Sequence, residues 1–140
     1  MTAYEGACHC GAIAYRYRTL LAPHEWNIRA CQCRFCRAHG ALTTSDTAGA
    51  LGFQERISGT LQRYRFGQKT ADFLICRVCG VYLGALIAAN DGRYGIINVN
   101  ALHPRPEGLP AAAAANYDAE SAEARIARRT RRWTPLSSDV

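Results

Sequence analysis

The chain lacks the features of a membrane protein or an exported one. Its longest mostly apolar run, residues 81–89, is broken by Gly84 and is far shorter than the ~18 residues of a membrane-spanning helix. The first residues carry neither the basic stretch nor the apolar stretch of a signal peptide. Also missing are a Ser-His-Asp set, a phosphate-binding glycine loop and a pair of carboxylates, which leaves hydrolytic chemistry of those kinds without support. We therefore expect no membrane span and a cytoplasmic location.

Charge is scarce over most of the chain. Charged residues make up 20% and hydrophobic residues 49% of the 140 residues, which is typical of a globular domain and excludes a disordered chain. The formal net charge is +6, and most of it comes from arginines between residues 125 and 132. From the length we predict one domain, residues 1–140, in which residues 118–140 form a helical, Arg-rich C-terminal segment.

Short segments rich in aromatic or β-branched residues indicate strands. In residues 12–18 the side chains of Ile13, Tyr15 and Tyr17 alternate with polar ones, as in a half-buried strand. The connections between such segments are too short for crossover helices, so we predict a mainly β fold with antiparallel sheets. The further strands that we predict are residues 61–66, 72–75, 81–88 and 94–102.

Two helical segments are also predicted. The first is a short turn over residues 34–39. The second covers residues 119–132, with Asp118 as its N-cap. The apolar face of this second helix is expected to carry Ala122, Ile126 and Trp133.

Seven cysteines in 140 residues are the most informative feature of the sequence. An odd number cannot all pair, and disulfides are rare in the cytosol, so clustered cysteines there more often bind metal or react. The cysteines form three groups, which are Cys8 with Cys10, Cys31 with Cys33 and Cys36, and Cys76 with Cys79.

The first and last groups together predict a closed zinc site. Cys8 and Cys10 share a face of extended chain, and Cys76 and Cys79 converge through a tight turn. Each pair is followed by a glycine, which permits a positive φ and lets backbone amides approach the sulfur atoms. Four thiolates in two such pairs are the usual ligands of tetrahedral zinc. The alternatives are buried free thiols or a redox dithiol formed by Cys76 and Cys79.

The middle group predicts a second, different zinc site. Cys31, Cys33 and Cys36 lie in one short loop and supply three ligands, which leaves the fourth position to water or substrate, as in catalytic zinc sites. The alternatives are a closed site that His39, His9 or His24 completes, or a site without metal. Three nearby arginines are expected to offset the thiolate charge and lower the thiol pKa values. They are Arg29, Arg34 and Arg37.

The cysteine motifs also carry a family resemblance. Residues 6–15 (GACHCGAIAY), 31–37 (CQCRFCR) and 73–80 (FLICRVCG) closely resemble the glutathione-dependent formaldehyde-activating enzymes, a family that includes centromere protein V. The resemblance implies a structural zinc at the four-cysteine set and a functional zinc at the three-cysteine set, hence two Zn²⁺ per chain. It also implies twisted antiparallel sheets of the Mss4-like type with zinc-binding loops.

The resemblance implies a zinc-dependent carbon-sulfur lyase that acts on a glutathione or other thiol adduct similar to S-hydroxymethylglutathione. A zinc with three thiolate ligands is a weak Lewis acid, so thiol exchange suits it better than activation of water. The sequence identifies neither catalytic nor substrate-binding residues and does not give the oligomeric state. The alternative is a non-catalytic zinc module that binds a partner. Nucleic acid is not the partner that we expect, because the arginines lack a basic body and an aromatic stacking platform.

Overall fold

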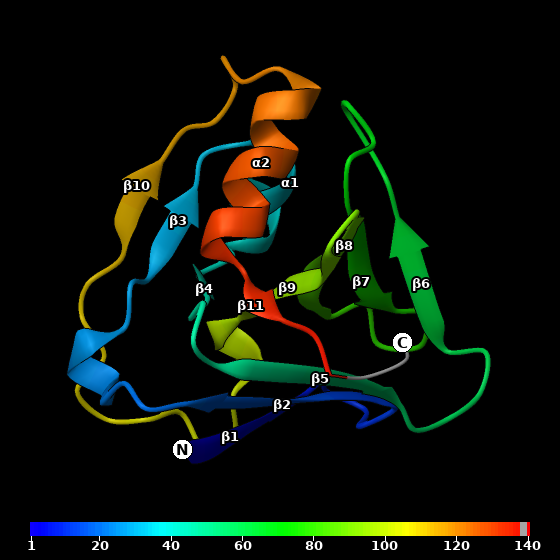
Figure 1. Ribbon diagram of the computed structural model, residues 1–140. Helices are drawn as coiled ribbons and strands as arrows, with labels where there is room; N and C mark the ends of the chain where they lie inside the picture. The colour runs from blue at the N-terminus through cyan, green and yellow to red at the C-terminus, as the bar shows by residue number, and fades with distance from the viewer. Residues whose placement is uncertain (138–139) are drawn as a thin grey trace.

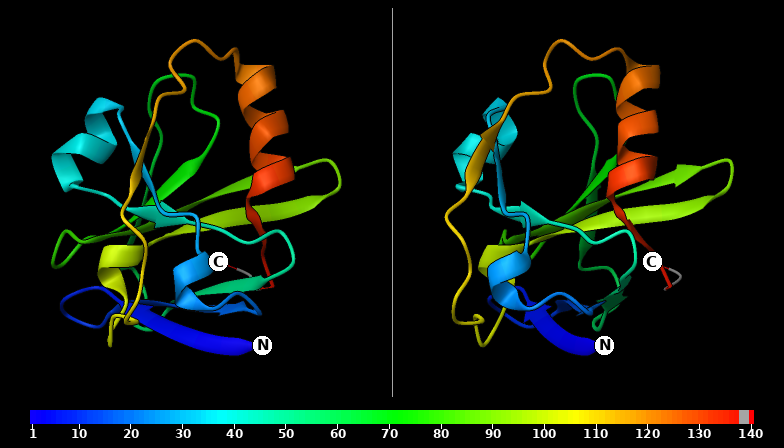
Figure 2. Two further views of the ribbon diagram at one scale, coloured as in Figure 1. Left: turned by 90° about the vertical axis from the view of Figure 1, so that its left-hand side faces the viewer. Right: turned by 60° about the vertical axis from the view of Figure 1, so that its left-hand side comes forward.

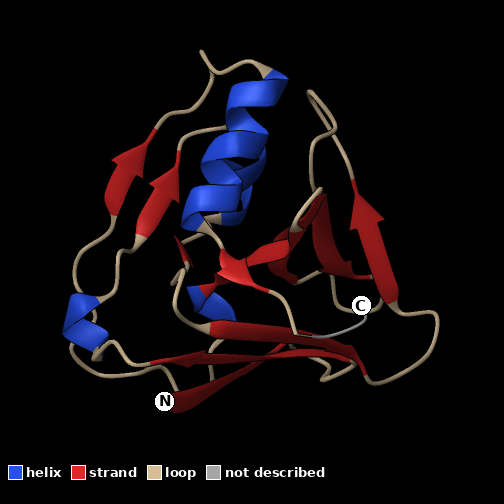
Figure 3. Ribbon diagram, in the orientation of Figure 1, coloured by secondary structure: helices blue, strands red, loops and turns tan. Residues whose placement is uncertain are grey.

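Two β-sheets form most of the computed structural model, which describes residues 1–137 and 140 (Figures 1 and 3). Within these residues the smaller sheet has three strands in the order β1-β2-β5, and both pairs are antiparallel. It forms the base of the molecule in Figure 1. Its strands are β1 (Thr2–Ala7), β2 (Ile13–Thr19) and β5 (Ala50–Glu55).

The larger sheet has the order β10-β3-β4-β9-β8-β7-β6 in the described part of the chain, and β11 pairs with β9 beside this path. Its pairs are antiparallel except for β10 and β3, which run parallel. Its strands are β3 (Arg29–Cys31), β4 (Thr43–Thr44), β6 (Leu61–Tyr64), β7 (Asp72–Cys76), β8 (Tyr82–Ala89), β9 (Gly92–Asn98), β10 (Ala113–Ala115) and β11 (Thr134–Pro135).

Short helices connect and cover the sheets. Helix α2 stands over the β8-β9 hairpin and packs against β8 (Figure 2). None of the helices in residues 1–137 is long and apolar enough to cross a membrane. The helices are α1 (Arg34–His39) and α2 (Ala122–Arg132), with 3-10 turns η1 (Pro23–Glu25) and η2 (Val99–Ala101).

The main apolar core lies between the two sheets. Tyr15 and Leu51 of the smaller sheet and Leu83 and Ile97 of the larger one are at most 1% exposed and belong to one buried cluster. The hydroxyl group of Tyr15 donates a hydrogen bond to the carbonyl oxygen of Asn98 at 2.8 Å, so the cluster leaves this polar group satisfied. Each such large apolar side chain contributes about 1.5–3 kcal/mol when fully buried.

A second buried cluster lies on the other side of the larger sheet. It includes Cys36 of α1, Phe73 and Tyr82 of β7 and β8, and Trp133 at the end of α2. This cluster holds both helices against the sheet, and it places one of the predicted zinc ligands at the edge of a core.

The predicted mainly β fold is confirmed, with two corrections to its strands. The strand predicted over residues 94–102 ends at Asn98, whose side-chain oxygen accepts a hydrogen bond from the Asn100 amide and caps the η2 turn. The sheets are not wholly antiparallel, because β10 pairs with β3 in parallel through backbone groups of the alanine run. Six of the described strands were not predicted, which are β1, β3, β4, β5, β10 and β11. Most of them are short or lack a clear alternation, but β5 does alternate, with Leu51 and Phe53 buried.

Helix α1 has the predicted bounds, whereas α2 differs from the prediction in its cap and in its buried face. The N-cap is Ser121, whose hydroxyl group accepts a hydrogen bond from the Ala124 amide at 3.1 Å, and not Asp118. The predicted apolar face is confirmed only at Trp133, which is 4% exposed, because Ala122 is exposed and Ile126 is 36% exposed. Within the helix the buried residue is Arg129. The arginine face, and not the alanine face, therefore packs on the protein.

A substitution at Gly84 tests the packing of β8 on β9. A Cβ atom there would lie 2.2 Å from the carbonyl oxygen of Ile96, and backbone at this position cannot give way without opening the sheet. We expect Gly84→Ala to lower the free energy of unfolding by about 1–3 kcal/mol, measured by urea denaturation. Ala88→Ser, at an exposed position of the same strand, serves as the control and should leave the midpoint nearly unchanged. Equal midpoints for both variants would contradict the close approach of the two strands.

Candidate metal centres

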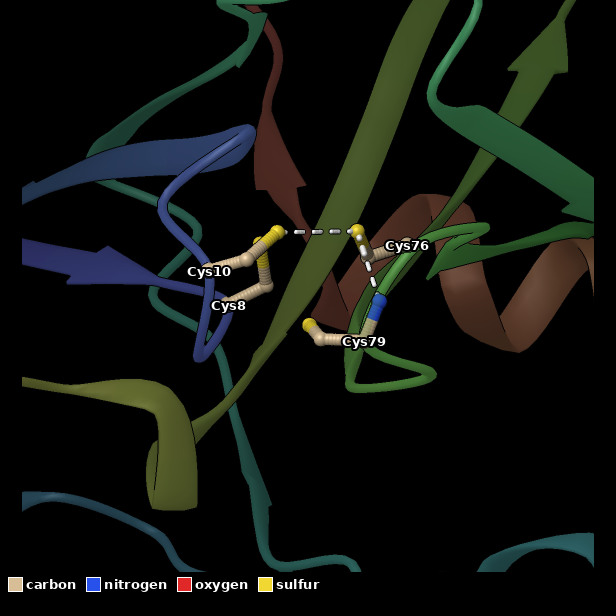
Figure 4. A group of neighbouring side chains, drawn as sticks. All are labelled: Cys8, Cys10, Cys76 and Cys79. Carbon is tan, nitrogen blue, oxygen red and sulfur yellow. Dashed lines mark hydrogen bonds between the residues drawn. The ribbon is translucent and has the colours of Figure 1, made fainter.

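The structure brings four cysteines from two distant turns into one cluster. Cys8 and Cys10 lie in the turn between β1 and β2, and Cys76 and Cys79 lie where β7 turns into β8 (Figure 4). Their sulfur atoms all lie within 4.8 Å of one another, with 3.7 Å from Cys8 to Cys10 and 3.6 Å from Cys10 to Cys76. Ligand sulfurs about 2.3 Å from a tetrahedral zinc ion are about 3.8 Å apart, so the donor set and its spacing fit such an ion.

Local backbone geometry aims these sulfur atoms. The amide of Ile13 donates to the sulfur of Cys8 at 3.3 Å, and the amide of Cys79 donates to the sulfur of Cys76 at 3.5 Å. The two glycines that follow the cysteine pairs, Gly11 and Gly80, have φ values of 82° and 81°. The predicted role of these glycines is therefore confirmed, because the left-handed conformation turns the chain back and presents amides to sulfur.

The other three cysteines form a second cluster at the start of α1. Cys31 ends β3, Cys33 is the N-cap of α1 and Cys36 lies in its first turns, 5% exposed. The three sulfur atoms lie within 4.8 Å of one another. A hydrogen bond from the Cys36 thiol lowers the pKa of Cys31 to about 5 and raises that of Cys36, so even without metal the cluster stabilises a thiolate.

No fourth protein ligand joins the three-cysteine cluster among the residues that the structure describes. Of the histidines that were alternatives for this position, His39 packs its ring on Phe35, with 4.5 Å between ring centroids, and His24 lies in the exposed turn η1. His9 is exposed beside the four-cysteine cluster and is not part of either group. The two clusters therefore differ, since one supplies four sulfur ligands and the other supplies three.

The three-cysteine cluster opens on a cavity of about 100 Å³. One side of the cavity is aromatic and includes Phe73, Tyr82 and Trp133, all at least nine-tenths buried. The other side is strongly basic. The charged residues that line it are Arg29, Arg125, Arg128, Arg129 and Asp118.

The carboxylate of Glu120, which is not among the lining residues, binds two of the arginines that line the cavity. Glu120 receives two hydrogen bonds from Arg128, at 2.8 and 3.0 Å, and lies 3.5 Å from Nε of Arg125. The contact with Arg128 keeps the pKa of Glu120 below its usual value. The Arg128 guanidinium also stacks 3.6 Å from the centre of the Tyr117 ring. These contacts fix the direction in which the guanidinium groups of α2 point.

Comparison with known proteins identifies the family. The model of the glutathione-dependent formaldehyde-activating enzyme family matches residues 3–117, which include all seven cysteines. The chain belongs to this family. The match ends before α2, which begins at residue 122.

Two individual proteins are similar to this member of the family. A protein of Halomonas elongata, named by inference as a glutathione-dependent formaldehyde-activating enzyme, is 36% identical over 55 residues, or 39% of this chain and 28% of its own length. A crystal structure of a Rhodobacter sphaeroides protein is 34% identical, with a TM-score of 0.54, and the alignment covers 76% of this chain and 90% of the other. The chain thus matches less than a third of the curated relative.

The cationic residues around the three-cysteine cluster were only partly predicted. Arg29 lines the cavity as expected, but Arg34 and Arg37 line a separate surface depression beside Phe35. Arginines of α2 line the cavity instead, although the sequence predicted for them only a helical, Arg-rich segment. Arg125, Arg128 and Arg129 are spaced at positions i, i+3 and i+4, which puts them on one face of the helix. This spacing is the feature of the sequence that could have predicted a shared arginine face.

The aromatic residues near the motifs also have different places. Trp26, five residues before Cys31 in the sequence, is 2% exposed and lies in the main core against Tyr4 and Tyr17, away from the cavity lining. Tyr82, which no motif singled out, lines the cavity instead. Its distance of 46 residues along the sequence from Cys36 gave no indication of this contact.

The four-cysteine cluster is expected to couple metal binding to folding in this family member. We expect wild-type protein purified without chelator to contain close to two metal ions per chain. Cys76→Ser should lose most of its folded protein, because a closed site contributes its binding free energy to folding. Metal analysis and circular dichroism measure both quantities. The control is Val78→Ser, at a residue 68% exposed in the same turn. Folded Cys76→Ser protein with unchanged metal content would contradict the assignment.

Proposed function

We propose that the protein is a zinc-dependent carbon-sulfur lyase whose substrate is an adduct of a thiol with a small aldehyde, such as S-hydroxymethylglutathione. The observation that carries the proposal is the three-cysteine cluster, which lacks a fourth ligand among the described residues and opens on a cavity. Family membership supports the same reaction and the same thiol. The four-cysteine cluster is assigned a structural zinc and the three-cysteine cluster a functional zinc.

The reaction exchanges one carbon-sulfur bond for a carbonyl group. In the adduct RS–CH₂–OH the carbon-sulfur bond breaks, the sulfur leaves with the bonding electrons as RS⁻, the hydroxyl proton is released, and CH₂=O forms. The reverse reaction makes the adduct from thiol and aldehyde. A zinc ion bound by Cys31, Cys33 and Cys36 would provide a position for the substrate sulfur and lower the pKa of its thiol.

The residues around the cluster provide the surroundings that this reaction needs. Phe73, Tyr82 and Trp133 are buried and form an apolar wall, which limits the access of water to the reacting carbon. Cys33 and Cys36 are held by helix α1, where the Cys36 amide donates to the Cys33 sulfur at 3.4 Å. The ligand sulfur atoms are therefore positioned before a substrate arrives, which reduces the entropy cost of reaching the reactive geometry.

The proposal places the protein in a reducing compartment, the cytoplasm. All seven cysteines are free thiols in the structure. Thiolate ligands and a thiol substrate both require reducing conditions, because oxidation to disulfides removes them.

The variant Cys33→Ser tests the proposal. We expect it to fold, because serine retains the N-cap of α1, and to contain about one metal ion fewer per chain. Turnover of S-hydroxymethylglutathione, followed by release of formaldehyde, should fall at least about a hundred-fold. Gln32→Ser, at the exposed neighbouring position, is the control and should keep both metal and turnover.

Two outcomes of this experiment would overturn the proposal. If Cys33→Ser loses one metal ion and keeps the wild-type rate, then the reaction occurs elsewhere. If the metal-loaded wild-type protein shows no turnover of any thiol adduct, then the protein is a non-catalytic zinc module.

A further inference from the structure

The cavity beside the three-cysteine cluster contains buried hydrogen-bond donors that the protein leaves unused. Four buried side-chain nitrogen or oxygen atoms have no hydrogen-bond partner within the described residues, and three of them belong to residues that line this cavity. They are Nε of Arg125, Nε of Arg129 and the hydroxyl group of Tyr82. The Arg125 atom has Glu120 as an ion-pair partner at 3.5 Å, so Arg129 and Tyr82 are the two unexplained donors.

Arg129 is the more unusual of the two. It is 8% exposed, and none of the described carboxylates lies within ion-pair distance of its guanidinium group. Its contacts are a hydrogen bond to the hydroxyl group of Thr70 at 2.7 Å and the ring of Trp133, whose centre lies 4.9 Å away. A buried charge without a counter-charge is costly, and burial lowers the pKa of Arg129 to about 10.

The charges around the cavity show what would balance this group. Arg29, Arg125, Arg128 and Arg129 contribute four positive charges to the lining, and Asp118 contributes one negative charge. Glu120 behind the wall adds one more negative charge. Three cysteine thiolates with a divalent ion carry a net charge of about −1. The site therefore retains a positive charge that an anionic ligand can neutralise.

We propose that this cavity binds the carboxylate group of the substrate, with Arg129 and Tyr82 as the hydrogen-bond donors. The inference rests on the proposed function, because it places the substrate sulfur at the three-cysteine cluster. It adds which residues recognise the acid group of such a thiol, and that one of them comes from α2, which lies outside the region matched by the family model.

The chemistry of the two donors favours a carboxylate. A planar guanidinium with a free Nε–H matches the lone pairs of a carboxylate oxygen, and hydrogen bonds between charged groups are stronger than neutral ones. The hydroxyl group of Tyr82 is buried in the cavity lining and has no partner among the described residues, so its O–H is available to donate. The aromatic wall accommodates the carbon chain between the sulfur and the acid.

Binding of matched thiols to the metal-loaded protein tests the inference without requiring turnover. The probes are 3-mercaptopropionate with its uncharged amide, and glutathione with its diethyl ester, each measured by titration calorimetry. Because both members of a pair have the same sulfur, the ratio of their affinities isolates the acid group. We expect the wild-type protein to prefer the acid by about ten-fold or more in at least one pair. A ratio near one in both pairs would overturn the inference.

Variants assign the preference to the two donors. Arg129→Met should bring the ratio close to one, whereas the control Arg131→Met, at an exposed position of the same helix, should keep it. Tyr82→Phe should lower the ratio about three-fold. Its control, Tyr17→Phe, removes the other unpartnered hydroxyl group among these four atoms, which lies in the main core. A full preference in Arg129→Met, or an equal loss of acid and amide binding in Tyr82→Phe, would overturn the assigned role.

Thermal unfolding and turnover, measured on the same variants, separate effects on folding and on the reaction from effects on binding of the acid group. Replacing a buried unpaired charge by an apolar side chain of similar length is often neutral for stability, and thermal unfolding checks this. If Arg129→Met does not fold, Arg129→Lys retains the charge without the planar group and should still weaken the preference. Acid preference without turnover would refute the lyase proposal alone, and turnover without acid preference would refute this inference alone.

Discussion

The convergence of four sulfur atoms from two hairpin turns is the contact on which the arrangement of the two sheets depends. Cys8 and Cys10 belong to the smaller sheet, and Cys76 and Cys79 belong to the larger one. Four thiolates at distances near 3.7 Å repel one another unless a cation lies between them. The same turns border the main core, so a cation bound there would hold together the same two sheets that the buried side chains join.

The three-cysteine cluster, in contrast, does not depend on a contact between distant segments. Its three cysteines come from one short stretch of chain, so they need no long-range contact to approach one another. The tertiary structure covers the cluster, because α2 and the loop between β6 and β7 pack over it. Gln68 of this loop donates a hydrogen bond to the backbone carbonyl of Glu120 at 3.0 Å, just before α2 begins. The resulting cavity is lined by the three cysteines and by arginines of α2.

The composition of α2 does not indicate that its arginines line a cavity. Arginines near a chain end are usually solvated, and α2 does expose Arg131 and Arg132. Trp133 packs into the second core at the end of α2, and Glu120 pairs with Arg125 and Arg128. Together these contacts turn Arg125, Arg128 and Arg129 toward the cavity.

The sequence by itself determined the thiol donors of the two candidate metal sites. Cysteine spacing and the glycines at 11 and 80 depend on local backbone geometry, which a few neighbouring residues set. Alternation determined strand β2 for the same reason. The tertiary structure alone decided that α2 covers the three-cysteine cluster and that Tyr82 and Arg129 face the same cavity. These contacts join residues 31–36, 82 and 129, and such distant pairings follow from the packing of whole elements, which no local pattern records.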